Sequence, residues 1–492
     1  MWDNRAERVT VRYDAAIIGA GANGLAAAAT LGRAGLKVIV LDRATVCGGR
    51  AITREFDPGF RASPFADELA PVPAEIFRDL DLARHGAILV PMPSSLALWP
   101  DRRHEVLHWS ASAAFSRLRT VVRSREKEIR ARALADAAHA IERRWFASAP
   151  EPTLWPSEDW SDLSLISFAG DWHLGEDARA HILAAALTGR VADPFATGSA
   201  LHLLAGHGGG MPIGGLATFG GALEAAARAA GAEISLGLEV ADIHLRGGRA
   251  IGLHLADGRE IDALAVISTL DLRRTFFSLF AWKDIPKVAE QRVSRYRNAA
   301  GRARLLLALD RPPALDPDFA QGQIHIAPGA AALAKAHDAW RCNVVPDEPP
   351  LTLRLVSASD PRLAPVGKAV LTATLGCIPH TVFDGAWTNE KRTALRDRTL
   401  ARIEMALPGV SASVLGSELI VPPDIEEQLG ITDGDLDGGE IAPDQMFALR
   451  GFEDHPGGRT PIGGLYLGGV SPAFGTCAAG VAAARAIMAD LT

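Results

Sequence analysis

The sequence predicts an α/β protein in which one domain is assembled from separated segments and a second, α+β domain fills the intervals. Three observations carry this prediction. The N-terminal residues 13–42 have the order strand, glycine turn, helix, strand. Apolar strand patterns with hairpin glycines recur far downstream, at 233–269 and at 464–470. The length of 492 residues suits two or three domains of roughly 150 residues each.

The N-terminal unit matches a Rossmann-like nucleotide-binding fold in the order of its elements. An apolar strand over 13–18 stops at the turn GAGANG over 19–24, and an alanine-rich helix follows to residue 33. A second strand over 38–41 ends at Asp42, which lies 23 residues after the first turn glycine. An acid at this position accepts hydrogen bonds from an adenosine ribose. The sequence therefore predicts a dinucleotide site, and a chance glycine turn is the alternative.

Each residue of the turn has a task in such a site. Gly19 permits the tight bend, Gly21 lets the backbone approach a pyrophosphate, and Gly24 lets the helix pack closely on the strand. The start of the helix, at Ala22 and Asn23, offers free N–H groups and a positive dipole end to the phosphates.

A second glycine pair indicates which dinucleotide is bound. Gly48, Gly49 and Arg50 follow the ribose acid, in the stretch CGGRAIT over 47–53. Paired glycines allow close backbone approach, and an arginine supplies a fixed cation for phosphate or flavin oxygens. The stretch resembles the GGRxxT segment of glutathione-reductase-like flavoproteins, in the branch that contains amine oxidases and phytoene desaturases. The resemblance implies FAD as the cofactor, and the predicted site includes Arg43 beside the ribose acid.

Downstream segments narrow the resemblance to the phytoene-desaturase-like dehydrogenases. These segments are PIGG at 212–215, DPRLAPVGK at 360–368, GE with DQMF at 439–447, and RTPIGGLY at 459–466. In that family the backbone at a position like Val240 contacts the adenine. The closing strand and helix, with Gly469, Cys477 and Ala479, are expected near the flavin. The segment SPAFGTC at 471–477 departs from the family's usual HPGGG stretch, which puts the substrate in doubt.

The same resemblance implies domain boundaries. Residues 1–65, 211–276 and 439–492 are expected to form the FAD-binding domain. Residues 66–210 and 277–438 are expected to form the substrate-binding domain.

The reaction implied by the resemblance is a flavin-dependent dehydrogenation. Hydride would pass from an apolar, isoprenoid-like or polycyclic substrate to flavin N5, and oxygen or a quinone would reoxidise the cofactor. Saturation of a double bond and redox-neutral isomerisation fit the sequence equally well. An amine or amino-acid oxidase and a non-catalytic escort protein for prenylated partners are the alternatives. No pattern identifies a catalytic base: His207, in a glycine-rich loop, is a candidate, and a solvent-exposed loop histidine is the simpler interpretation.

Composition and charge argue against other classes. A net charge of −7 disfavours nucleic acid as a partner. Four scattered cysteines predict neither disulfides nor a metal site, and Cys47 is expected to be a packing residue. Without a signal peptide or an apolar run of about 18 residues, a cytoplasmic protein is expected. The basic stretch 117–132 suggests peripheral contact with the inner membrane face, and a solvated helix face is the alternative. No feature indicates the oligomeric state.

Overall fold

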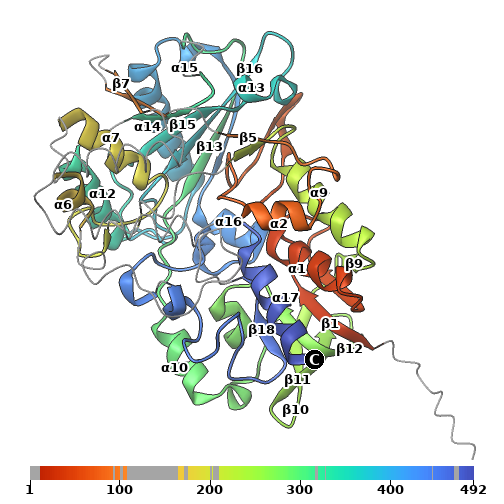
Figure 1. Ribbon diagram of the computed structural model, residues 1–492. Coiled ribbons are helices and arrows are strands. Elements are labelled where there is room, and N and C mark those ends of the chain that lie inside the picture. The colour runs from red at the N-terminus through yellow and green to blue at the C-terminus, as the bar shows by residue number, and fades with distance from the viewer. Residues whose placement is uncertain are drawn as a thin grey trace, which may run out of the picture.

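The computed structural model describes most of the chain. The described ranges are 12–91, 95–99, 104–107, 164–170, 176–199, 202, 210–315, 320–326, 329–445, 447–469 and 476–491. Within them the chain forms two seven-stranded sheets in different parts of the molecule, which confirms the predicted α/β class (Figure 1). Among the described helices, none combines the length and the hydropathy that crossing a membrane requires.

The first sheet contains the N-terminal unit. Its strand order is β10-β11-β12-β1-β2-β9, and β18 also pairs with β12. The strands are β1 (Tyr13–Ile18), β2 (Val38–Asp42), β9 (Glu233–Leu236), β10 (Val240–Arg246), β11 (Arg249–Leu255), β12 (Glu260–Ser268) and β18 (Leu465–Leu467). Three separated stretches of chain therefore build one sheet, as the sequence predicts.

Strand β1 is buried on both faces of this sheet. Ala15 and Ile17 pack on one side, against α1 (Ala22–Arg33), α9 (Leu216–Ala229) and α17 (Ala478–Leu491). The alternate residues of β1 face the opposite core, which includes Phe276. Burial on both faces explains why β1 reads as a continuous apolar run, since parallel strands covered on both sides lack polar alternation.

The second sheet has the order β17-β13-β16-β15-β14-β6-β7 and lies at the top of Figure 1. Its strands are β6 (Ser95–Leu98), β7 (His104–Leu107), β13 (Ala303–Leu309), β14 (Gln323–Ile326), β15 (Leu351–Leu355), β16 (Ala369–Leu375) and β17 (Val414–Ile420). One face carries leucines that pack on α14 (Asn389–Ala406), including Leu395 and Ile403 of that helix.

Shorter elements connect and cover the two sheets. They are β3 (Arg54–Asp57), β4 (Phe60–Ala62), α2 (Ala74–Asp79), β5 (Leu89–Pro91), α6 (Leu165–Gly170), α7 (Glu176–Ala186), β8 (Gly210–Pro212), α10 (Lys287–Arg295), α12 (Ala330–Arg341), α13 (Val356–Ser359), α15 (Val410–Ser413) and α16 (Pro422–Leu429). Single helical turns are η2 (Arg274–Ser278), η3 (Trp282–Asp284), η4 (Pro361–Leu363), η5 (Thr432–Gly434), η6 (Pro443–Gln445) and η7 (Phe447–Arg450).

The hairpin of β3 and β4 joins the N-terminal segment to the second sheet. Arg54 forms an ion pair with Glu418 of β17, with 2.9 Å between Nη1 and Oε2. Phe60 packs with Leu306 and Val370 of the second sheet. The sequence assigns residues 1–65 to the FAD-binding domain. Side chains of this hairpin nevertheless pack with residues that are assigned to the substrate-binding domain.

Candidate cofactor and substrate site

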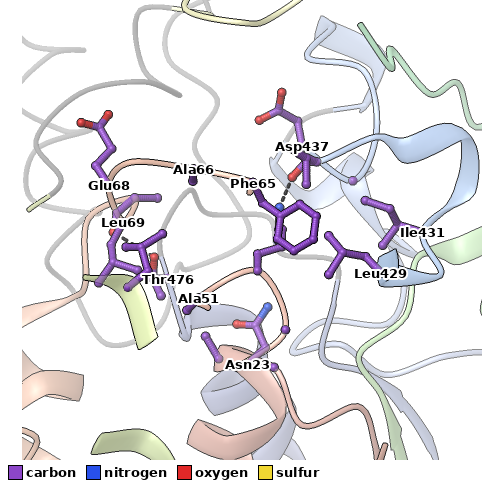
Figure 2. Close-up of a pocket in the computed structure, with 18 of the residues that line it drawn as sticks. Asn23, Ala51, Phe65, Ala66, Glu68, Leu69, Leu429, Ile431, Asp437 and Thr476 are labelled. Carbon is purple, nitrogen blue, oxygen red and sulfur yellow. Dashed lines mark hydrogen bonds between the residues drawn. The ribbon is translucent and has the colours of Figure 1, made fainter. Parts of the chain in front are cut away.

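A cavity of about 420 Å³ lies between the two sheets. Its wall contains residues of the glycine turn after β1 at one end and residues of β13 to β16 at the other. Figure 2 shows Asn23 on one side of this cavity and the carboxylates of Glu68 and Asp437 on the far side.

The glycine turn presents the start of α1 to the cavity. Gly21 is the N-cap residue, no side chain caps the helix, and its first turn contains no acid. The first N–H groups of a helix have no partner within the helix, so Ala22 and Asn23 offer donors and a positive dipole end to an anion. This arrangement fits the pyrophosphate of a dinucleotide.

Gly24 allows α1 to pack against the turn that precedes it. A Cβ atom at this position would lie 1.9 Å from the carbonyl oxygen of Gly19. No real side chain tolerates such a contact, so the position requires glycine. The predicted close packing of helix on strand is present.

Asp42 is fixed by two backbone hydrogen bonds at the end of β2. Its Oδ2 accepts from the N–H of Ala20 at 2.7 Å, and its Oδ1 accepts from the N–H of Ala44 at 2.8 Å. The carboxylate lines the cavity, and each oxygen keeps a lone pair for a ribose hydroxyl.

The second glycine pair docks against the first turn. The N–H of Gly48 donates to the carbonyl of Ala20 at 2.9 Å, and Gly48 forms a bridge with Gly21. Gly49 has a φ of +57°, and a Cβ atom on it would lie 3.1 Å from the Cα of Gly21. Two glycine stretches that are separate in sequence thus make one backbone surface without side chains.

Arg50 extends from this surface into the cavity. Its guanidinium donates to the carbonyl of Leu436, and its side chain is exposed to the cavity. Burial within the molecule lowers the pKa of Arg50, and the negative charge of Asp437 opposes this shift. The neighbouring cation Arg302 lowers the pKa further and Asp435 raises it, so Arg50 lies among charges of both signs.

The C-terminal segment closes the same cavity. Gly469 and Cys477 line it, and Thr476 donates from its N–H to the carbonyl of Pro71 at 2.9 Å. Helix α17 begins at the residue after Cys477, so its N-terminus lies beside the cavity. Ala479 is buried in the first turn of α17.

None of the four cysteines forms a disulfide. Cys47 packs against the core of the first sheet, as the sequence predicts, and burial raises its pKa to about 12. Burial also raises the pKa of Cys477. Both side chains are therefore neutral thiols at neutral pH, which makes them poor nucleophiles.

The structure brings most of the predicted site residues together. Those in the cavity wall are Gly19, Gly21, Ala22, Asn23, Asp42, Gly48, Gly49, Arg50, Gly469 and Cys477. Four predicted residues lie outside the described wall: Gly24, Arg43, Val240 and Ala479. His207, the basic stretch 117–132 and most of the unusual segment 471–477 are outside the described residues.

Two of these departures have a geometric reason. The side chain of Arg43 leaves the site and donates to the carbonyl of Glu427 at 2.7 Å. Val240 begins β10, where it is paired with Leu255 at the edge of the first sheet. Their contacts with FAD stay predictions.

Sequence reasoning missed the charged wall at the second sheet. Arg304 of β13 is only 1% exposed and holds Asp67 with both Nη atoms, the Nη1 contact to Oδ2 measuring 2.7 Å. Thr372 donates to Oδ1 of Asp67 at 2.8 Å. Burial raises the pKa of Asp67, but the charge and hydrogen bonds of Arg304 outweigh it, so the pKa lies below its usual value.

A second ion pair lies beside the first. Arg354 of β15 donates from Nη1 to Oε2 of Glu68 at 3.1 Å, and Gln323 of β14 donates to Oε1 at 3.0 Å. Burial raises the pKa of Glu68, and the charge of Arg354 only partly offsets this. Glu68 is thus a cavity carboxyl that protonates more readily than an ordinary glutamate.

A third group of charges surrounds Asp437. Arg302 donates from Nη2 to Oδ2 of Asp437 at 3.2 Å, and Nε of Arg190 lies 3.5 Å from Oδ1. Despite burial, these cations together with Arg50 and Arg450 hold the pKa of Asp437 below its usual range.

One further cluster lies apart from the described cavity wall. His380, Glu426 and Asp433 bring potential ligand atoms within 4.8 Å of one another. However, Arg274 also donates to Glu426 at 3.0 Å, so a cation there would compete with a guanidinium. The absence of a metal site stays a prediction.

The two-sheet fold with a nucleotide turn facing a shared cavity is the arrangement of a dinucleotide-binding protein, and the family match makes it a flavin-containing oxidoreductase. The chain belongs to the flavin-containing amine oxidoreductase family, whose model matches residues 23–408. FAD is the cofactor, and the backbone surface and Asp42 fit it. The resemblance to the amine oxidase and phytoene dehydrogenase group is confirmed.

Relatives with different names match nearly the whole chain. The rat pyridine nucleotide-disulfide oxidoreductase domain-containing protein 2 is 28% identical over 97% of this chain and 94% of its own length. A neurosporene-forming phytoene desaturase of Rhodobacter capsulatus is 26% identical over 83% of this chain and 81% of its own. A structure of putrescine oxidase bound to putrescine has a TM-score of 0.64 at 16% identity, covering 98% of this chain and 99% of that one.

Proposed function

We propose that the protein is an FAD-dependent dehydrogenase that removes hydride from a carbon atom of an organic substrate. The observation that carries this proposal is the continuity of one cavity from the nucleotide turn to the second sheet. When bound, FAD supplies at its N5 atom a hydride acceptor. Oxygen or a quinone is the proposed final acceptor.

The protein's own residues bind and orient the cofactor and limit the access of water to the cavity. The start of α1 and the paired glycines bind the phosphates, and Asp42 orients the ribose. Phe65 and Leu69, both buried and both in the wall, supply apolar surface to the cavity, which limits the access of water. Glu68 lines the cavity, and burial raises its pKa above that of an ordinary glutamate.

The substrate predicted by resemblance is apolar, and the named phytoene desaturase supports that prediction. The charged wall formed by Arg304, Arg354 and Arg302 supports a polar substrate instead. An amine or amino-acid oxidase is therefore the second candidate function.

Anaerobic mixing of the flavin-loaded protein with organic acids, amines and polyenes tests the proposal. Bleaching of the oxidised flavin absorbance by one class is the expected result. If amines alone bleach the flavin and oxygen then yields peroxide, the amine oxidase replaces our proposal. A colourless preparation that gains no flavin absorbance on addition of FAD would contradict both functions.

A further inference from the structure

The second sheet has one apolar face and one face that is polar where it meets the cavity. On the apolar face, leucines of β13, β15 and β16 pack on α14. On the opposite face, the register places Arg304 beside Thr374, Thr374 beside Thr352, and Thr372 beside Arg354. All five side chains are buried. Four of them line the cavity, and the fifth, Thr372, donates a hydrogen bond to Asp67, which lines it.

Burying so many polar groups has a large cost. Removing an ion from water costs several kcal/mol even after relaxation, and partner charges recover it only with good geometry. A wall that only had to contact a hydrocarbon would be more stable with apolar side chains of similar volume. The polar face is therefore better explained by a polar ligand than by a polyene.

The balance of charge at this end of the cavity is positive. The described wall contains six arginines (Arg50, Arg190, Arg302, Arg304, Arg354 and Arg450) and six acids. Two of the acids, Asp42 at the nucleotide turn and Asp271 after β12, are held by other partners, so four acids (Asp67, Glu68, Asp435 and Asp437) lie among the arginines. Burial raises the pKa of two of these acids, Glu68 and Asp435, which favours their neutral forms. An anion entering here gains attraction, and a cation does not.

Arg302 has the geometry to receive that anion. It precedes β13 and is held on two sides, by Asp437 through Nη2 and by the carbonyl of Gly189 through Nε at 3.4 Å. Within the part of the chain that the structure describes, its Nη1 donates to no partner. A guanidinium fixed on two sides loses little entropy when it binds a planar carboxylate.

We propose that the substrate is an organic acid whose ionised carboxylate binds Arg302, on the second-sheet side of the flavin. This inference rests on the proposed function and names the substrate class for the same cavity. Arg190, on the other side of Asp437, adds long-range attraction. The ion pairs of Asp67 and Glu68 hold Arg304 and Arg354 in place, so the polar face is formed before the ligand arrives.

Benzoate and benzamide test this substrate class in the intact, FAD-loaded protein, because they share a shape and differ in charge. The dissociation constant of each is measured from the change in flavin absorbance during titration. We expect benzoate to bind at least about tenfold more tightly than benzamide, and added salt to weaken benzoate alone. Equal affinities, tighter binding of benzamide, or no response to benzoate up to about 50 mM would overturn the proposal.

Variants at Arg302 assign the site. Arg302→Met should weaken benzoate at least about tenfold without affecting benzamide, and Arg302→Lys should recover part of the affinity. Arg259→Met is the matched control, because Arg259 is exposed in the turn between β11 and β12, where it pairs with Asp257. Unchanged benzoate affinity in Arg302→Met would also overturn the proposal.

The ratio of flavin to protein separates the two possible failures. A preparation that binds no FAD contradicts the proposed function. A flavin-loaded preparation that does not distinguish benzoate from benzamide contradicts only the substrate class. The comparison of the two ligands in the unmodified protein stands even if Arg302→Met fails to fold.

Discussion

The first sheet meets the cavity with backbone, whereas the second sheet meets it with charged side chains. Around the nucleotide turn, Gly21, Gly48 and Gly49 line the cavity without side chains, and Asp42 is fixed by backbone donors. Across the cavity, the contacts come from arginines and acids joined in buried ion pairs. A surface without side chains suits a ligand that never changes, and a charged surface can select one substrate among many.

The largest loss of stability is expected from breaking an ion pair of the second sheet. Arg304→Met leaves Asp67 buried without its cation, which should lower the free energy of unfolding by about 3–5 kcal/mol. Adding Asp67→Asn should recover part of this loss. Chemical denaturation of the two single variants and the double variant measures the coupling. Strictly additive losses would show that the pair is not coupled and would weaken the contrast between the two regions.

A smaller loss of stability is expected from adding one methyl group to the nucleotide turn. Gly24→Ala places a Cβ against the carbonyl of Gly19 and should cost about 1–3 kcal/mol, with loss of most bound flavin. Gly221→Ala, in α9, is the matched control: no heavy atom lies within 4 Å of the added Cβ. That control should gain about 0.5–1 kcal/mol and keep its flavin. Equal flavin content in the two variants would contradict the role assigned to Gly24.

Acidification should strengthen binding of benzoate through Glu68. Burial raises the pKa of Glu68, so lowering the pH removes its negative charge before that of an ordinary glutamate. The loss of a negative charge beside Arg354 favours an anion in the cavity, and the dissociation constant of benzoate should fall about two- to fivefold. Glu68→Gln should reduce this trend and leave the part that Asp435 contributes, because burial raises the pKa of Asp435 as well. A variant that keeps the same pH dependence would exclude Glu68 as its source.

The smallest effect is expected at Cys47. Its pKa of about 12 keeps the thiol protonated, so Cys47→Ala should leave the flavin spectrum unchanged and shift stability by less than about 1 kcal/mol. Alkylation with iodoacetamide, followed by mass spectrometry, measures which cysteine thiols are accessible and reactive. Exposed Cys342 should react, and buried Cys377 and Cys477 should not. Rapid alkylation of Cys47 would contradict the assignment of a packing role.

The first sheet could be predicted because its information is local. The turn glycines, α1 and Asp42 follow one another within thirty residues, and the structure places them where the sequence order implies. The paired glycines add a contact over only a short stretch, from Gly21 to Gly48. The predicted residue Arg43 lies outside the cavity wall, because its side chain binds the carbonyl of Glu427, which is distant in sequence.

The charged wall of the second sheet could not be assembled from local patterns. Arg304 meets Asp67 across 237 positions, and Arg354 meets Glu68 across 286. One signal was available: the strands ARLLLAL, LTLRL and AVLTATL each carry polar residues on one face only. Alternation of this kind indicates a sheet with one polar face, but it does not show what that face contacts.

A structure of the protein with FAD and benzoate bound is the most direct test of the whole account. We predict the adenosine ribose at Asp42, the phosphates at the start of α1, and the carboxylate of benzoate within hydrogen-bonding distance of Arg302 on the second-sheet side. A benzoate bound outside the cavity, or a flavin whose phosphates lie away from the glycine turn, would contradict it.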